Sequence, residues 1–250
     1  MIQKVNLPSS FQLFSYDNVD STNEEAKRLA KKGIPDGAIV WAKEQSSGIG
    51  RRGRKWVSAN GNLFFSILLR PNCSVPEAMQ LSFVTSLSIM EIIDDVLPES
   101  VNVNCKWPND ILVENRKISG ILLESQSKPK GDIDWIVIGV GLNIKSFPKD
   151  LEFPATALIR EGAKDYMCAE IMLELFSHHF LSIYKTWEKF GFETIRIAWL
   201  SRVAWLGKKI SVRLEQETLK GEFKNLDKDG ALILLQNGVE RRITAGDVFV

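Results

Sequence analysis

Cysteine and histidine are scarce in this chain of 250 residues, which contains three cysteines and two histidines. Cys73, Cys105 and Cys168 are odd in number, widely spaced and outside any Cys-x-x-Cys pattern, so the sequence predicts neither a disulfide framework nor a zinc site. His178 and His179 are adjacent in a helical run, where neighbouring side chains diverge and cannot bind one metal ion together. With only these two histidines, a hydrolase that uses a histidine-based triad is disfavoured.

The sequence also lacks long apolar runs and an excess of charge of one sign. No uninterrupted apolar stretch is long enough to span a bilayer, and the first residues contain no apolar core of a signal peptide. Lys and Arg total 32 against 31 Asp and Glu, which argues against a general polyanion-binding surface. We therefore expect a cytoplasmic protein of one or two domains with no nucleic-acid or membrane partner.

The most informative segment is the run Gly-Ile-Gly-Arg-Arg-Gly-Arg-Lys-Trp at residues 48–56. Its glycines allow positive φ and close approach to a ligand, and its arginines present planar forks of donors that match phosphate and carboxylate groups. The glycine spacing matches the dinucleotide fingerprint, but a turn signal and a strand follow it instead of a helix. No Gly-Lys-Ser/Thr follows either, which excludes a P-loop. We interpret the segment as a phosphate clamp, with a solvated basic hairpin loop as the alternative.

Helix and strand signals surround this segment. Residues 21–33 carry a Ser-x-x-Glu capping box, basic residues in the last turn and a final glycine, which predicts a short helix. Residues 38–42 are expected to form a strand that leads to Gln45 and the glycine-rich loop, and residues 63–69 a buried strand after it. A long apolar helix is predicted over residues 74–97.

The second half of the chain contains more strand signals than helix signals. Four consecutive strands are expected at residues 101–106, 111–113, 117–124 and 135–144. Such a run favours a mixed or antiparallel sheet over alternating βαβ units. A helix is predicted from about residue 168 to 190. After about Val203, short strands separated by turns resemble a small β-barrel, and they are expected at residues 209–213, 219–223, 232–235 and 239–243.

Three further segments carry chemistry. Residues 106–110, Lys-Trp-Pro-Asn-Asp, combine a cation, a flat stacking surface, a rigid turn and two oxygen-bearing side chains at a strand end, where binding sites are common. An ordinary turn is the alternative. On the next strand, alternation places Lys117 and Ser119 on one face and leaves room for a ligand at Gly120 on the other. The glycine pattern at residues 139–143 indicates close backbone approach, with a tight β-bulge as the alternative.

Taken in this order, and together with Ser-Thr-Asn at residues 21–23, these segments resemble the biotin protein ligases. The resemblance covers residues 15 to 190, and the terminal strands are similar to the SH3-like domain of such enzymes. It implies an α+β fold, with a mixed or antiparallel sheet and packed helices in a class II synthetase-like catalytic domain, followed by a small SH3-like β-barrel. We expect the catalytic domain at residues 1–202 and the terminal domain at residues 203–250.

The resemblance also implies a reaction and its participants. Biotin and ATP would give biotinyl-5′-AMP and pyrophosphate, and biotin would then pass to a lysine of a biotin carboxyl carrier protein domain in acetyl-CoA carboxylase or a related carboxylase. ATP and biotin are the expected substrates, and Mg²⁺ is the expected metal ion. A carboxylate must meet an α-phosphate in the first step, so cations are needed to hold the two anions together.

Roles for individual residues follow from the same resemblance. The expected catalytic residues are Lys117, Arg51, Lys106 and Asp110, and Asp110 is also the expected contact to Mg²⁺. The residues expected to bind biotin are Ser21, Thr22, Asn23, Gln45, Ile49, Gly50, Arg51, Lys117, Gly120 and Leu122. Those expected to bind ATP or the adenylate are Arg52, Arg54, Trp56, Asn109 and Asn143. Hydroxyl and amide groups suit the ureido ring of biotin, which needs both donors and acceptors.

The chain departs from the family pattern at Ile49, where the family loop commonly has an arginine. If that position acts through its main chain, little is lost; if it acts through a guanidinium, affinity for biotin or phosphate is weaker. About twenty residues precede Ser21, too few for the DNA-binding domain that some members carry, so no operator binding is expected. The oligomeric state stays open, and a homodimer through a sheet edge, as in some relatives, is one form of it.

Two rival interpretations remain. A lipoate or octanoate ligase resembles this fold and also activates an acid for transfer to a carrier lysine, but the arginine-rich loop and residues 106–110 favour biotin. A non-catalytic module, with the loop and the terminal barrel gripping RNA or a peptide, predicts salt-sensitive polyanion binding. That second interpretation leaves the series of polar strand ends unexplained.

Overall fold

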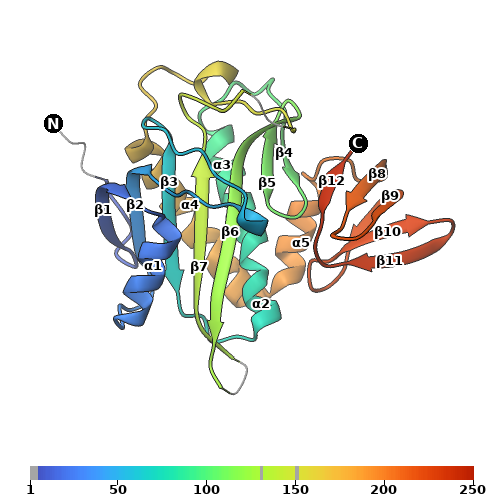
Figure 1. Cartoon of the computed structure of the whole chain (residues 1–250), viewed down its shortest axis with the longest axis horizontal. Coiled ribbons are helices and arrows are strands. Elements are labelled where there is room, and N and C mark those ends of the chain that lie inside the picture. The colour runs from blue at the N-terminus through green and yellow to red at the C-terminus, as the bar shows by residue number, and fades with distance from the viewer. Residues whose placement is uncertain (1–4, 130–131, 150–151) are drawn as a thin grey trace.

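A seven-stranded sheet forms the centre of the computed structural model, which describes residues 5–129, 132–149 and 152–250. Its strands lie in the order β1-β2-β3-β7-β6-β5-β4 (Figure 1). Their bounds are β1 Gln12–Val19, β2 Ala38–Gln45, β3 Leu63–Leu69, β4 Val103–Lys106, β5 Asp110–Val113, β6 Arg116–Ser127 and β7 Ile133–Leu142. β1 is parallel to β2, and the other neighbours are antiparallel. The predicted mixed sheet is therefore confirmed.

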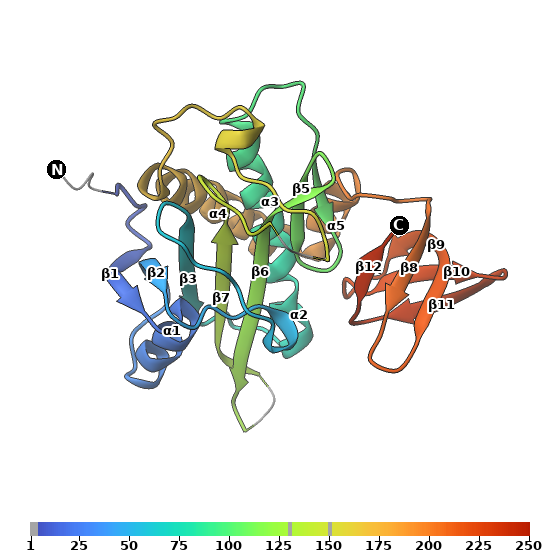
Figure 2. The same cartoon turned by 45° about the horizontal axis from the view of Figure 1, so that its top comes forward.

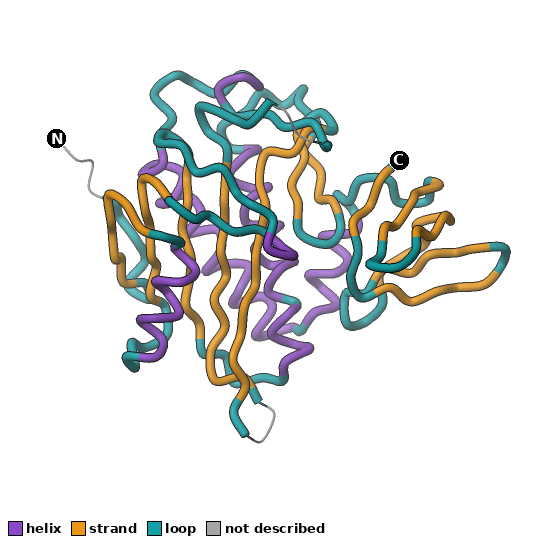
Figure 3. Tube along the Cα trace, in the orientation of Figure 1, coloured by secondary structure: helices purple, strands orange, loops and turns teal. Residues whose placement is uncertain are grey.

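Helices cover both faces of this sheet (Figure 1). The helix α1 (Thr22–Lys31) packs against β2, β3 and β7 on one face. The helices α3 (Leu81–Asp94) and α4 (Ala169–Phe190) pack against each other and against the opposite face. The segment between β2 and β3 crosses the sheet on the same side as α1 and reaches β6 (Figure 3). One face of the sheet therefore builds the core, and the other is partly left for a site.

The main core lies between the sheet and the α3–α4 layer. Along β2, Val40 packs with the small cluster under α1, whereas Ile39 and Trp41 belong to the main core, as strand alternation requires. Phe65 of β3 and Phe176 of α4 are both fully buried, and their ring centroids are 4.7 Å apart. Tilted aromatic packing of this kind fastens α4 to the centre of the sheet.

Two predictions about helix boundaries need correction. The helix expected over residues 74–97 is divided at Gln80 into α2 (Val75–Met79) and α3, and α2 begins at a capping box. There the Ser74 hydroxyl accepts from the Glu77 N–H, and the Glu77 carboxylate accepts from the Ser74 N–H at 2.8 Å. The capping box predicted for α1 is wrong, because the N-cap residue Ser21 makes no side-chain capping bond. Its side chain is buried beside the site described below.

A second sheet follows α5 (Phe192–Leu200), a helix that the sequence did not predict. Five antiparallel strands lie in the order β11-β10-β9-β8-β12. Their bounds are β8 Lys209–Arg213, β9 Thr218–Leu226, β10 Leu232–Gln236, β11 Val239–Ile243 and β12 Asp247–Phe249. Figure 2 shows this sheet beside the larger part of the molecule, next to α5. The first four strands match the predicted positions closely, whereas β12 was not predicted.

Hydrogen bonds, and not a free linker, join the two sheets. The Cys105 N–H donates to the Arg202 carbonyl at 3.0 Å, and the Cys105 carbonyl accepts from the Ala204 N–H at 2.7 Å. The Trp107 indole N–H donates to the Gly230 carbonyl at 3.1 Å. The domain boundary expected at residue 202 falls inside this connection and stays a prediction. Because the connection is pinned to β4, the C-terminal sheet is held beside the strands that carry residues 106–110.

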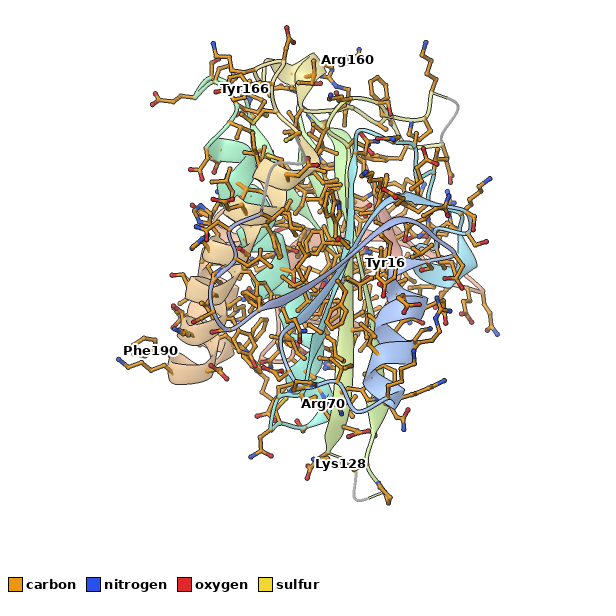
Figure 4. All side chains as sticks on the ribbon, turned by 90° about the vertical axis from the view of Figure 1, so that its left-hand side faces the viewer. Tyr16, Arg70, Lys128, Arg160, Tyr166 and Phe190 are labelled. Atoms are coloured by element: carbon orange, nitrogen blue, oxygen red, sulfur yellow. The ribbon has the colours of Figure 1, made fainter. Side chains whose placement is uncertain are left out.

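Surface features distinguish the two ends of the sheet. In Figure 4, Lys128 lies near the tip of the β6–β7 hairpin, and Arg160 and Tyr166 lie at the opposite end. Phe190, at the end of α4, points away from the molecule and is 60% exposed. Among the residues that the structure describes, no helix is long and apolar enough to cross a membrane.

Replacing Phe176 by alanine tests the aromatic core. Phe176→Ala should lower the free energy of unfolding by about 3–5 kcal/mol, because the neighbouring side chains cannot collapse fully into the cavity. The control Ile197→Ala changes an α5 side chain that is 59% exposed and should cost less than about 0.5 kcal/mol. Urea denaturation followed by circular dichroism measures both values. Equal losses in the two variants would contradict the placement of Phe176.

Candidate active site

A cavity of about 270 Å³ opens on the α1 side of the sheet. Its walls come from the glycine-rich loop, the start of α1, β6, β7, residues 152–155 and the final strand β12. Every residue that was assigned to a site from the sequence lines this cavity, with the exception of Arg52. The structure therefore brings together segments that are far apart in the sequence.

Uncharged polar groups occupy one end of the cavity. The Thr22 N–H donates to Gln45 Oε1 at 2.8 Å, and the Thr22 hydroxyl lies 3.1 Å from the same oxygen. Gln45 Nε2 donates to the Ser58 hydroxyl at 2.8 Å, which in turn donates to the Trp56 carbonyl at 3.1 Å. The amide of Gln45 is thereby oriented, with its oxygen toward α1 and its nitrogen toward the glycine-rich loop.

The glycine-rich loop, residues 48–56, folds back on itself as a narrow hairpin. The Gly50 N–H donates to the Arg54 carbonyl at 2.7 Å, and the Trp56 N–H donates to the Gly48 carbonyl at 2.9 Å. A Cβ atom at Gly48 would lie 2.5 Å from the Trp56 carbonyl oxygen, so only glycine fits there. The hairpin of the alternative interpretation is thus present, but it forms a wall of the cavity instead of standing free in solvent.

The tip of this hairpin is a tight turn at Arg51–Gly53. Arg52 has a φ of 56° and Gly53 a φ of 70°, so both adopt the left-handed conformation. Ile49 pairs with Lys55 across the hairpin through the main chain, and its side chain is 44% exposed at the cavity. Since the loop closes through backbone contacts at Ile49, an arginine is not needed there for its folding.

Glycines in β6 and β7 make room for side chains that lie on the sheet. A Cβ atom at Gly141 would lie 2.4 Å from the Trp56 indole, and one at Gly120 would lie 3.0 Å from it. A Cβ atom at Gly139 would lie 2.0 Å from Asn23 Oδ1. The predicted close approach is confirmed, with the protein's own side chains as neighbours. Within the described residues, the buried indole N–H of Trp56 has no hydrogen-bond partner and lies over Gly141.

Cations occupy the other end of the cavity. Lys117 Nζ lies 2.5 Å from Asp110 Oδ1, and Lys106 Nζ lies 3.8 Å from Asp110 Oδ2, so one carboxylate separates two ammonium groups. Lys106 is 6% exposed, and its Nζ lies 3.8 Å from the centre of the Phe153 ring. Burial lowers the pKa of Lys106, the Asp110 charge opposes this shift, and the Lys117 charge adds to it.

The orientation of Lys117 corrects the prediction from strand alternation, which placed it with Ser119 and opposite Gly120. The register of β6 against β5 shifts at this point, which leaves Ile118 as an extra residue in β6. This β-bulge turns Lys117 toward the cavity, where its Nζ lies 3.3 Å from the Cβ position of Gly120. Ser119 is fully buried and does not line the cavity.

Arg51 connects the glycine-rich loop to residues 106–110. Its Nη1 lies 3.2 Å from Asn109 Oδ1 and 3.4 Å from the Gly246 carbonyl. Asn109 Nδ2 donates to the Ile121 carbonyl at 2.6 Å, which fixes the amide that receives Arg51. Burial lowers the pKa of Arg51. This arginine is therefore held in place before any anion arrives.

Asn143 forms a hydrogen bond to the segment that follows residues 152–155. Its side-chain Nδ2 donates to the Thr156 carbonyl at 2.9 Å, and the residue is buried. The contact holds the end of residues 152–155, which place Phe153 over Lys106. In this structure the Asn143 amide donates to the protein while the residue lines the cavity.

The C-terminal sheet contributes side chains that the sequence did not single out. Asp247 of β12 accepts from Arg54 Nη2 at 2.9 Å and lies 3.5 Å from Arg52 Nη1. Phe249 lies with its ring centre 5.5 Å from Lys106 Nζ. Burial raises the pKa of Asp247, but the hydrogen bond from Arg54 and the arginine charges outweigh it and hold the pKa below its usual value. A single acid in a short final strand is too common a pattern to have marked this residue.

The metal contact expected at Asp110 has no preformed cluster around it. Across residues 5–129, 132–149 and 152–250, no group of three or more His, Cys, Asp and Glu side chains is arranged to hold a metal ion. Both oxygens of Asp110 already face lysine ammonium groups. Such surroundings favour an anion over a cation at this position.

Comparison with known proteins places this site in a family. Residues 16–143 match the Biotin/lipoate A/B protein ligase family, and residues 205–250 match the Biotin protein ligase C terminal domain. A biotin–[acetyl-CoA-carboxylase] ligase of Paracoccus denitrificans is 36% identical over 234 residues, which are 92% of this chain and 97% of the relative. The chain belongs to the Biotin/lipoate A/B protein ligase family.

Other members of this family resemble the chain over most of its length. The biotin protein ligase from Aquifex aeolicus in complex with biotin and ATP is 28% identical, with a TM-score of 0.80 over 95% of this chain and 97% of that chain. The bifunctional ligase/repressor BirA of Bacillus subtilis is 29% identical over 241 residues, which are 94% of this chain and 73% of the repressor. The α+β fold expected from the resemblance is confirmed.

Asp247→Asn tests whether the C-terminal sheet restrains the tip of the glycine-rich loop. Loss of the ion pair with Arg54 should make residues 51–55 about two to five times more sensitive to trypsin, because a pair at this exposure stabilises by up to about 1 kcal/mol. The control Asp17→Asn removes an exposed pair with Lys43, far from the loop. Mass spectrometry of timed digests measures cleavage after each residue. Identical rates in the two variants would contradict the restraint.

Proposed function

We propose that this chain activates biotin with ATP and transfers it to a lysine of a biotin carboxyl carrier protein domain. The observation that carries the proposal is the division of one cavity into an uncharged polar end and a cationic end. Thr22 and Gln45 mark the first end, and Lys106, Lys117 and Arg51 mark the second. A neutral polar ring joined to a carboxylate, with a phosphate beside it, fits this division. Biotin and ATP are bound in the Aquifex aeolicus relative.

The first step joins two anions. A carboxylate oxygen of biotin attacks the α-phosphorus of ATP, the bond from that phosphorus to the oxygen bridging to the β-phosphate breaks, and pyrophosphate leaves. Lys117 and Arg51, which line the cavity from β6 and from the loop, would hold the carboxylate and the α-phosphate against their repulsion. Lys106 would stabilise charge on the phosphoryl oxygens. Asp110 lies between the two lysines and offsets their mutual repulsion until the anions arrive.

The second step transfers the acyl group. The amine of the carrier lysine attacks the carbonyl carbon of the mixed anhydride, an amide bond forms, and AMP leaves with the electron pair of the broken C–O bond. The attacking nitrogen must lose a proton. Asp110 is the carboxylate that we propose as its acceptor, because it lies between the lysines that hold the anhydride.

Closure of the loop would protect the anhydride from water. Trp56 already lies against Gly141 and Gly120, so the indole forms a lid over the sheet. The pairs from Arg54 and Arg52 to Asp247 would hold the tip of the loop while the intermediate waits for the carrier.

We assign the other site residues the roles that the family resemblance implies. Those proposed to bind biotin, all of which line the cavity, are Ser21, Thr22, Asn23, Gln45, Ile49, Gly50, Gly120 and Leu122. Those proposed to bind the nucleotide are Arg54, Trp56, Asn109 and Asn143, which line the cavity, and Arg52 at the loop tip. Mg²⁺ would enter with ATP and be held chiefly by the phosphate oxygens, since magnesium keeps several waters and few protein ligands.

The proposal extends to the organisation and setting of the protein. Residues 1–202 would form the catalytic domain and residues 203–250 the SH3-like domain, which acts on the site through Asp247. We propose that the enzyme works in the cytoplasm on a carboxylase carrier domain, without a nucleic-acid partner. We also keep a homodimer as a form compatible with this activity.

Transfer to a carrier tests the function directly. The purified chain is incubated with biotin, ATP, Mg²⁺ and an unmodified biotin carboxyl carrier domain, and intact-mass spectrometry follows the carrier. A gain of one biotinyl group, absent when the carrier lysine is replaced by arginine, supports the proposal. No gain with biotin, together with lipoyl or octanoyl transfer to a lipoyl domain, would assign the chain to the other branch of its family.

Lys117→Ala tests the cationic end. The side chain is 25% exposed, so the variant should stay folded. Adenylate formation in a single turnover should fall by about 10²-fold or more, because the lost ammonium group faces developing charge. The control Lys43→Ala removes an exposed lysine that pairs with Asp17 on β1, and it should leave the rate within about twofold. Full activity in Lys117→Ala would remove this residue from the mechanism.

A further inference from the structure

Two side chains behind the polar end of the cavity have no part in the reaction described so far. Ser66 of β3 is fully buried, Glu124 belongs to β6, and neither lines the cavity. They contact Asn23 from opposite sides. Ser66 Oγ lies 2.6 Å from Asn23 Oδ1, and Asn23 Nδ2 donates to Glu124 Oε2 at 2.8 Å. Asn23, 4% exposed, is therefore held between a hydroxyl and a carboxylate.

These contacts allow only one orientation of the Asn23 amide. A carboxylate at neutral pH accepts hydrogen bonds and cannot donate them, so the amide nitrogen must face Glu124. The amide oxygen then faces Ser66, whose hydroxyl must donate to it. The opposite orientation would set the amide oxygen against the carboxylate and leave a buried pair of acceptors, which costs more than the hydrogen bonds gain.

The orientation of the Ser66 hydroxyl in turn determines that of the Thr22 hydroxyl, which belongs to the cavity wall. Ser66 Oγ also lies 2.8 Å from Thr22 Oγ1, and a serine hydroxyl has a single proton. Because that proton is given to Asn23, the Thr22 hydroxyl donates to Ser66 across the shorter of its two contacts, 2.8 Å against 3.1 Å to Gln45 Oε1. The Thr22 N–H donates to Gln45 Oε1 at 2.8 Å. The donors and acceptors at this end of the cavity thus follow from Glu124 and Ser66.

The backbone and a neighbouring charge hold this arrangement in place. Ser66 pairs with Gly139 in the sheet, and it is at Gly139 that a Cβ atom would collide with Asn23 Oδ1. Lys27 Nζ lies 2.9 Å from Glu124 Oε1, so the second oxygen of the carboxylate is occupied by a cation. Glu124 is thus left to receive the amide nitrogen through Oε2 alone.

We propose that Ser66 and Glu124 are positioning residues that set the donor and acceptor pattern of the cavity for the urea group of biotin. The inference rests on the proposed function and adds to it the source of substrate selectivity. A urea presents two N–H donors beside one carbonyl acceptor, so it binds well only where the complementary groups have fixed polarity. A site with fixed hydrogen-bond polarity rejects a ring that lacks these groups far better than an apolar pocket rejects a change of size.

The test measures ATP–pyrophosphate exchange as a function of biotin and of ATP in the full chain. Ser66→Ala should raise the KM for biotin about tenfold and leave the KM for ATP and kcat within about twofold, because one buried acceptor loses its donor. The control Ser88→Ala removes a fully buried hydroxyl of α3 that donates to the Val84 carbonyl at 2.8 Å, outside the cavity wall. It should change neither KM.

Glu124 gives a second and independent variant, because its side chain is 35% exposed and tolerates replacement. Glu124→Leu should raise the KM for biotin as Ser66→Ala does, and Glu124→Gln should restore most of the affinity through its amide oxygen. A biotin KM in Ser66→Ala and Glu124→Leu equal to that of Ser88→Ala would overturn the proposal. An equal rise of both KM values would also overturn it, since that result indicates general loosening. Absence of biotin-dependent exchange in the unmodified chain would instead refute the proposed function.

Discussion

The charge balance of the cavity is the constraint on which the rest of the site depends. Several cations share a partly buried space, where mutual repulsion is stronger than in water. Two carboxylates offset it: Asp110 between Lys106 and Lys117, and Asp247 against the arginines of the loop tip. They come from different sheets, β5 and β12. Part of this charge balance therefore comes from the C-terminal sheet, which hydrogen bonds hold beside β4.

The second constraint is the limited space between the central strands and the side chains above them, and glycines in β7 provide that space. The central strands β6 and β7 approach Trp56 and Asn23 so closely that any Cβ atom at Gly139 or Gly141 would collide with these side chains. The sheet can therefore carry a polar residue and an indole directly on its face, where a strand normally presents its own side chains. The polar end and the lid of the cavity are both consequences of this closeness.

The parts of the site that the sequence predicted are those in which chemistry is concentrated in short runs. The glycine-rich loop and residues 106–110 concentrate chemistry in consecutive residues, so composition singled them out, and the family resemblance supplied the roles of their residues. The side of the sheet that Lys117 occupies depends on a bulge, which arises from pairing with β5 and leaves no local signal. Asp247 and Arg54 are 193 residues apart in the sequence. A contact over such a separation produces no periodic pattern in the sequence from which it could be predicted. The sequence did not distinguish Ser66 from other residues of a buried strand, because its contact with Asn23 arises only in the folded structure.

The measurement that tests the central claim most directly is ATP–pyrophosphate exchange by the purified chain with Mg²⁺ and one of four additions: biotin, lipoate, octanoate or no acid. Exchange measures formation of the acyl-adenylate without requiring the carrier. The division of the cavity into polar and cationic ends predicts exchange that depends on biotin and is absent with the other three additions. Exchange with lipoate or octanoate in place of biotin, or none with any acid, would contradict it.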